Sequence, residues 1–165
     1  MQDVILLTGA GQIGLAIARR MGHGKKIVVS DKNINNAQTV TKIMAEAGFD
    51  AVAVEADISS RKSILNMIAA AQKYGEIAML INAAGVSPSQ ASVETILKVD
   101  LYGTAVLLEE VGKVIKAGGT GVTISSQSGH RNRRTACCYT GRRTAAAGSI
   151  KAGQYQRHTA CVSNG

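Results

Sequence analysis

The sequence predicts an α/β fold, a doubly wound parallel sheet of five strands with an incomplete carboxyl-terminal half. Short apolar segments rich in Val and Ile alternate with longer segments whose apolar residues recur at helical spacing. Such alternation favours a parallel sheet joined by right-handed crossovers. The periodicity stops after Ser128, so only five strands are expected.

The first half of the pattern contains three strands and two helices. Val4–Thr8 is a nearly continuous apolar run, typical of a strand buried on both faces. A helix is expected at Ile13–Met21, a second strand at Lys26–Ser30, a second helix at Asn35–Ala47 and a third strand at Ala51–Glu55. The glycine directly after the second helix is a typical helix end.

The second half continues the alternation. Ser60–Tyr74 is predicted to be a helix opened by serines, which are favoured at helix starts. Ala78–Asn82 reads as the fourth strand, Val93–Lys116 as one long helix closed by two glycines, and Gly121–Ser125 as the fifth strand. We expect the spatial order 3-2-1-4-5.

A GxGxxG motif, GAGQIG, directly follows the first strand and opens the first helix. In a Rossmann-type βαβ unit Gly9 makes the tight turn, Gly11 lets the backbone approach a pyrophosphate, and Gly14 lets helix and strand pack closely. Backbone N–H groups at the helix start, including Gln12 and Ile13, are then available to phosphates. The alternative is a glycine-rich turn without a ligand.

Asp31 ends the second strand, about 20 residues after the glycines, where a carboxylate accepts hydrogen bonds from the adenosine ribose hydroxyls. A carboxylate there repels the additional phosphate of NADP, so NAD is the expected cofactor and NADP is less favoured. Lys32 weakens that preference. The alternative is a solvated loop aspartate.

These motifs together resemble the short-chain dehydrogenase/reductase family, from Asp3 to about Arg131. Ala-Asp-Ile after the third strand resembles the family's adenine-contacting turn, and Asn-Ala-Ala-Gly after the fourth strand resembles its NNAG motif. The glycine pattern departs from the family's usual TGxxxGxG. The resemblance implies further cofactor contacts at Asp57, Ile58, Asn82, Ala83 and Gly85.

The same resemblance points to catalytic positions. Ser126, after the fifth strand, stands where the family has the serine that hydrogen-bonds the substrate oxygen. Tyr139 follows it by 13 residues, a common family spacing, but Arg143 stands where the catalytic lysine is expected. Asp100 replaces an asparagine that supports the family's proton relay; the alternative is a partly buried helix carboxylate.

Composition divides the chain in two. Residues 1–128 contain 12 Lys and Arg and all 11 acids, whereas residues 129–165 contain seven Lys and Arg and no acid within a total net charge of +8. Such a shift marks a boundary. We therefore expect an NAD-binding Rossmann domain over 1–130 and a basic, irregular tail over 131–165.

The tail has the composition of a sequence read out of frame, rich in Arg, Ala, Gly and Cys without acids or leucines. With suitable third bases, a one-base shift turns residues 141–148 into EEELLLP and residues 158–164 into TLHAYQM. The second segment is similar to the family's tyrosine helix. The intended lysine would then lie just past residue 165.

Other classes of protein fit the sequence less well. A chain of 165 residues with 45% hydrophobic residues suits one globular domain. No apolar run approaches the roughly 20 residues of a membrane span, and the start has no secretory pattern, so a cytoplasmic location is expected. The three cysteines give no disulfide framework, and the tail's Cys and His fit no zinc spacing, so no metal is expected.

The family resemblance implies an NAD-dependent oxidoreductase that moves a hydride between an alcohol or ketone and the cofactor, inactive as written because the Tyr–Lys pair is missing. Three alternatives stay open: an unusual intact reductase using Ser126 and Tyr139, an NAD-binding protein without catalysis, and a nucleic-acid-binding module. No specific nucleic acid and no membrane partner are expected, since the tail's charge lacks a recognition motif. A homo-oligomer through the helix at 93–116 is a further expectation.

Overall fold

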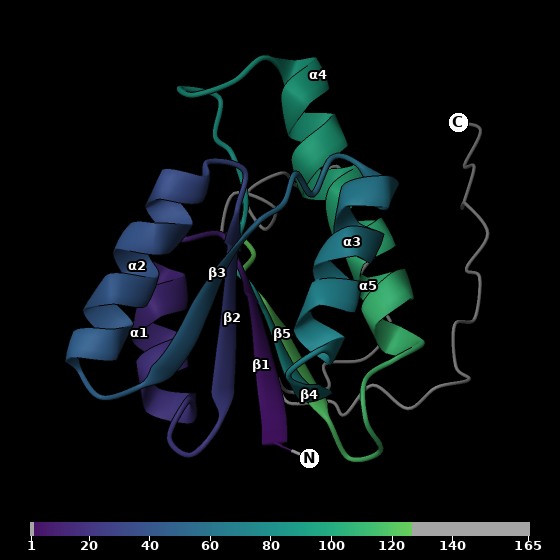
Figure 1. Ribbon diagram of the computed structural model, residues 1–165. Helices are drawn as coiled ribbons and strands as arrows, with labels where there is room; N and C mark the ends of the chain where they lie inside the picture. The colour runs from purple at the N-terminus through teal and green to yellow at the C-terminus, as the bar shows by residue number, and fades with distance from the viewer. Residues whose placement is uncertain (1, 127–165) are drawn as a thin grey trace.

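The computed structural model describes residues 2–126, which form one fully parallel sheet with helices on both faces (Figure 1). The spatial order β3-β2-β1-β4-β5 confirms the predicted order. The strands are β1 (Gln2–Thr8), β2 (Lys26–Asp31), β3 (Asp50–Glu55), β4 (Gly75–Asn82) and β5 (Thr120–Thr123). The helical segments are α1 (Gln12–Met21), α2 (Ile34–Glu46), α3 (Arg61–Gln72), α4 (Val93–Ile96), the π-helical η1 (Leu97–Gly103) and α5 (Thr104–Gly112).

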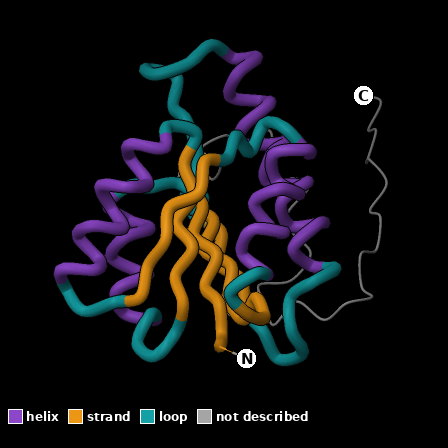
Figure 2. The backbone as a smooth tube through the Cα atoms, viewed as in Figure 1, coloured by secondary structure: helices purple, strands orange, loops and turns teal. Residues whose placement is uncertain are grey.

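Helices flank the sheet on both sides (Figure 2). Alternate residues of the central strands belong to two separate buried clusters, one for each helical layer. Ile5 and Leu7 of β1 lie in the core under α1 and α2, whereas Val4 and Leu6 lie in the core under α3 and α5. All four side chains are fully buried, which explains why β1 reads as a continuous apolar run rather than an alternating one. The strand therefore contributes to both cores.

The order of the strands places a switch point between β1 and β4. The chain first builds outward from β1 through β2 to β3, and then crosses back through α3 to β4 on the other side of β1. Helices α1 and α2 consequently cover one face, and α3 and α5 cover the other (Figure 1). In open parallel sheets a ligand crevice forms at the carboxyl ends of the strands at such a point.

No helix within residues 2–126 is long and apolar enough to cross a membrane.

The predicted continuous α-helix over 93–116 is corrected by the structure. Its middle, η1, is π-helical, and the helical stretch ends at Gly112. Periodicity of apolar residues does not separate an i+4 ladder from a local i+5 ladder, and a glycine lowers helix propensity at the end. Gly103 packs tightly under the turn after β3, because a Cβ there would lie 2.5 Å from the carbonyl oxygen of Ile58.

Strand β4 begins at Gly75, three residues before the predicted start at Ala78. Gly75 pairs with Gln2 at the beginning of β1, and the two backbones approach so closely that no side chain fits between them. The sequence signal was misleading because a glycine and an acid precede the apolar run, which is typical of a turn. Close backbone approach explains the glycine instead.

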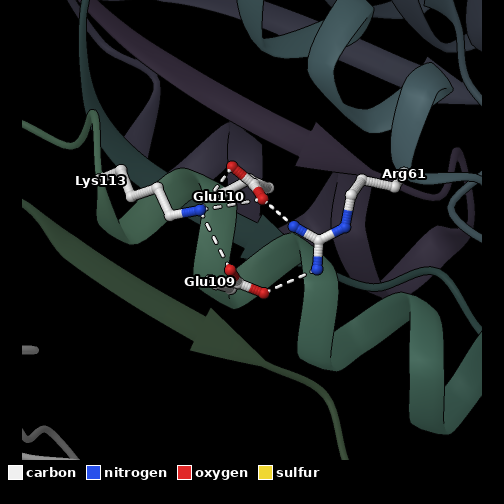
Figure 3. Close-up of polar contacts among 4 residues, drawn as sticks. All are labelled: Arg61, Glu109, Glu110 and Lys113. Carbon is white, nitrogen blue, oxygen red and sulfur yellow. Dashed lines mark hydrogen bonds and ion pairs between the residues drawn. The ribbon is translucent and has the colours of Figure 1, made fainter.

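A network of charged side chains joins α3 to α5 (Figure 3). Arg61 of α3 forms ion pairs with both Glu109, at 2.8 Å, and Glu110. Lys113 donates to the same two carboxylates at 3.0 Å. Glu110 is buried, so the two cations compensate for a carboxylate that would otherwise be costly to remove from water.

This network makes a prediction about acid stability. The hydrogen bonds from Arg61 and Lys113 lower the pKa of Glu109 from 4.5 to about 2. A carboxyl whose pKa is lower in the folded state contributes stability above its unfolded pKa, and this contribution is lost as the pH falls from 4.5 toward 2. Urea unfolding at a series of pH values should therefore show a smaller acid loss in Glu109→Gln than in the unaltered protein.

The matched control is Glu76→Gln, which removes an exposed carboxylate of β4 that forms no ion pair within the described part of the chain. It should keep the pH dependence of the unaltered protein. If acidification lowers the free energy of unfolding of Glu109→Gln as much as that of Glu76→Gln, the ion pairs of Glu109 do not contribute to acid stability.

Candidate functional site

A groove of about 370 Å³ lies at the carboxyl ends of β1, β2, β3 and β4, at the switch point of the sheet. The glycine loop forms one wall, the ends of β2 and β3 form the rim, and the segment after β4 forms the other wall. Its lining includes Gly9, Ala10, Gly11, Asp31, Lys32, Asn36, Asp57, Ile58, Ala83, Ala84, Gly85 and Val86.

The glycine loop is held by close backbone contacts. Gly9 has a φ of 84°, a left-handed conformation that favours glycine, and its N–H donates to the carbonyl of Ser30 at 2.8 Å. A Cβ at Gly9 would lie 2.6 Å from the backbone nitrogen of Ala84. A Cβ at Gly14 would lie 2.7 Å from the side chain of Leu7. The first and third glycines thus allow β1, α1 and the segment after β4 to meet.

The middle glycine has a different environment. Gly11 is the N-cap residue of α1, and no side chain forms a capping hydrogen bond there. A Cβ added at Gly11 would have no protein atom within 4 Å. The N–H groups of the first turn, which include Gln12 and Ile13, have no partner within the helix. This positive helix end can therefore bind an anion.

Asp31 fastens the end of β2 to the glycine loop. Its Oδ2 accepts a hydrogen bond from the N–H of Ala10 at 2.9 Å, and its Oδ1 accepts one from the N–H of Asn33 at 2.9 Å. Oδ1 also accepts a hydrogen bond from Asn36 Nδ2 at 3.5 Å, so a ligand hydroxyl would donate to the remaining lone pair of Oδ2. These bonds hold the carboxylate at the rim of the groove.

Asp57 and Lys32 face each other across the same end of the groove. The Oδ1 atom of Asp57 accepts from the backbone and hydroxyl of Ser59, at 2.9 and 2.6 Å, and its Oδ2 lies 3.2 Å from Lys32 Nζ. Burial acts to raise the pKa of Asp57, but the hydrogen bonds from Ser59 and the pairing with Lys32 outweigh it and lower that pKa. Asp57 is thus a carboxylate at neutral pH.

Asn82 lies beneath the groove rather than in its wall. Its side chain is 1% exposed, accepts from Thr8 Oγ1 at 2.7 Å and donates to Thr104 Oγ1 at 3.3 Å. These bonds join β1, β4 and α5 directly below the segment that lines the groove. Sequence reasoning missed Thr8 and Thr104, since neither threonine stands out in its own segment.

A second groove, of about 500 Å³, continues from the first toward β5. Asp100 of η1 and Ser126, the last described residue, both line it. Asp100 Oδ1 accepts from the N–H of Val86 at 3.0 Å, which ties the segment after β4 to η1. π-helical turns are frequent at functional sites, and this one positions Asp100.

The structure brings most of the sequence-predicted site residues together. Gly9, Gly11, Asp31, Asp57, Ile58, Ala83 and Gly85 line the first groove, and Ser126 lines the second. Gln12 and Ile13 are exposed at the start of α1, while Gly14 and Asn82 are buried behind the grooves. Tyr139, Arg143 and the tail's Cys and His lie outside the described residues.

Known proteins match this chain in sequence. The family described as short chain dehydrogenase matches residues 3–160, nearly the whole chain. The chain belongs to the short-chain dehydrogenase family. This match extends beyond Arg131, where the motifs alone placed the end of the resemblance, and its range includes Tyr139.

Relatives of the family support the assignment. A short-chain dehydrogenase/reductase, bsc3, of Alternaria brassicicola is 40% identical over 78% of this chain and 47% of its own length. A 3beta-hydroxysteroid dehydrogenase of Mediterraneibacter gnavus is 28% identical over 92% of this chain and 59% of its own. The chain thus spans about half to three fifths of the length of these two relatives.

Solved structures show the same architecture. The F189W actinorhodin polyketide ketoreductase, solved with NADPH, is 30% identical, with a TM-score of 0.68 over 84% of this chain and 58% of that one. A short-chain dehydrogenase/reductase of Serratia marcescens has a TM-score of 0.68 over 80% of this chain and 58% of that one, at 21% identity, which shows the fold alone.

Proposed function

We propose that this chain binds NAD in the first groove, in preference to NADP. The observation that carries the proposal is the carboxylate of Asp31, fixed at the rim by the N–H groups of Ala10 and Asn33. The family's members use nicotinamide cofactors, and the glycine loop in this chain fits one. A pyrophosphate would be bound by the uncapped start of α1, next to the open side of Gly11.

The preference follows from charge. A carboxylate accepts hydrogen bonds from the ribose hydroxyls of NAD but repels the phosphate that NADP carries at the same place. Lys32 is the nearest cation in sequence, and it pairs with Asp57 at 3.2 Å instead of neutralising Asp31. The related ketoreductase was solved with NADPH, so the preference proposed here depends on this chain's own residues.

Calorimetric titration with NAD and NADP tests the proposal. The unaltered chain should bind NAD more tightly, and Asp31→Asn should weaken NAD binding about tenfold, as expected for loss of a charged hydrogen-bond acceptor. Asp31→Asn should also reduce the difference in affinity between NAD and NADP. Asp3→Asn is the matched control: it makes the same change in β1, where Asp3 pairs with Lys116 outside the groove. If the unaltered chain binds NADP as tightly as NAD, or more tightly, Asp31 does not create a preference for NAD.

For a protein in which the Tyr–Lys pair is present, we propose hydride transfer between the cofactor and an alcohol or ketone. The nicotinamide would supply or accept the hydride, and Ser126 would hydrogen-bond the substrate oxygen in the second groove. The chain as given would bind cofactor without turnover, because a lysine does not follow Tyr139 at the required position. The NAD-binding domain would cover residues 1–130, and the basic tail would cover residues 131–165. We also predict that the tail attracts polyanions non-specifically. A cytoplasmic location is a further prediction.

A homo-oligomer through the 93–116 segment is also proposed. Val93, Leu97 and Leu101 recur at helical spacing and are 73%, 52% and 66% exposed, so one side of α4 and η1 presents an apolar stripe. Exposed apolar stripes of this kind mark association surfaces. Sedimentation equilibrium should show self-association that Leu101→Glu weakens; a monomer at all concentrations would contradict the proposal.

A further inference from the structure

The two grooves form one continuous surface. They share the segment after β4 as a common wall, with Ala83, Ala84, Gly85, Val86 and Gln90 lining both. The first groove contains the glycine loop and Asp31, which suit the ADP half of a dinucleotide. If that half binds there, as proposed above, the nicotinamide half extends along the shared wall into the second groove.

The second groove has a simple charge pattern. Asp100 is the one ionisable side chain among the described residues that line it. Its Oδ1 accepts from the N–H of Val86 at 3.0 Å, which fixes the carboxylate beside the shared wall. No described Lys or Arg pairs with Asp100, and Lys98 of the same segment is engaged by Glu94 at 2.8 Å. Among the residues that the structure describes, the groove therefore carries a negative charge that no Lys or Arg compensates.

We propose that Asp100 makes this site favour the oxidised nicotinamide over the reduced one. The oxidised ring is a pyridinium cation and the reduced ring is neutral, whereas the rest of the molecule is the same. A fixed carboxylate attracts the cation and gains nothing from the neutral ring, so its effect falls on one redox state. Asp100 is then a specificity-determining residue for the redox state of the cofactor, an inference that rests on the proposed function.

The experiment compares three ligands with the full chain: NAD⁺, NADH and ADP-ribose, which lacks the nicotinamide. In Asp100→Asn the ratio of the NADH to the NAD⁺ dissociation constant should fall about fivefold, as expected for one charge across a partly solvated groove. The amide keeps the acceptor for Val86, so ADP-ribose affinity and the melting temperature should change little. Asp100→Glu should restore most of the ratio.

Glu76→Gln is the control, since it removes the same charge from β4, outside the groove, and Glu76 forms no ion pair among the described residues whose loss would release a cation. It should leave the ratio unchanged. If the unaltered chain binds ADP-ribose and both dinucleotides but Asp100→Asn keeps its ratio, this inference is wrong and the proposed function stands. If Glu76→Gln lowers the ratio as much, the effect is one of net charge and the inference also fails. If no ligand binds the unaltered chain, both proposals fail.

Discussion

The chain as given is expected to show no oxidation of alcohols and no reduction of ketones above the background of cofactor and buffer. Hydride transfer needs a proton moved to or from the substrate oxygen, and a positioned acid contributes roughly 10²–10⁴-fold to the rate. In the family this acid is a tyrosine assisted by a lysine four residues later. Here Arg143 follows Tyr139, and a guanidinium is wider and differently hydrated than an ammonium.

The assay compares the chain with a frame-restored, full-length version, using NAD and a panel of sugar alcohols, steroids and simple secondary alcohols. The restored protein should turn over at least one class of substrate. Activity of the chain as given, abolished by Tyr139→Phe, would show that the tail is read in the correct frame and that Tyr139 is the catalytic acid.

Gly9→Ala is expected to be strongly destabilising. Its Cβ would lie 2.6 Å from the nitrogen and 2.7 Å from the Cα of Ala84, and these backbone atoms cannot move without disturbing β4. The left-handed φ of 84° adds a further cost. Together, the clash with Ala84 and the left-handed φ should lower the free energy of unfolding in urea by about 2–4 kcal/mol and abolish NAD binding.

Gly11→Ala is the matched variant in the same loop. Gly11 lines the groove and an added Cβ meets no protein atom within 4 Å. Stability should therefore change by less than about 1 kcal/mol, the usual range for a helix cap, while NAD binding weakens because the methyl group occupies the space beside the pyrophosphate. If Gly9→Ala and Gly11→Ala lose equal stability, the contrast between a crowded Gly9 and an open Gly11 is wrong.

The sequence predicts the sheet well because its strands are buried on both faces. Val4, Leu6 and their neighbours form uninterrupted apolar runs. The regular alternation of strands and helices leaves only a few topologies for a parallel sheet. The sequence fails where backbone meets backbone. Gly75 and Gly103 read as a turn residue and a weak helix residue, but each is required by a close approach to a distant segment, Gln2 and Ile58 respectively.

The candidate site divides in the same way. Motif spacing predicts the glycine loop and Asp31, because their roles follow from local order along the chain. The pairing of Lys32 with Asp57 depends on β2 and β3 lying side by side, and the hydrogen bond from Val86 to Asp100 depends on the path of η1. Neither contact has a signature in the sequence, since the partners are 25 and 14 residues apart.

The most direct measurement maps NAD onto the protein by following backbone amide chemical shifts during a titration. The largest saturable changes should occur at residues 9–14, 31–32, 57–58 and 83–86, with smaller changes at Asp100. NADP at the same concentration should shift the same amides less. Changes centred away from these residues, for example on the apolar stripe of α4 and η1, would contradict the assignment of the groove to the cofactor.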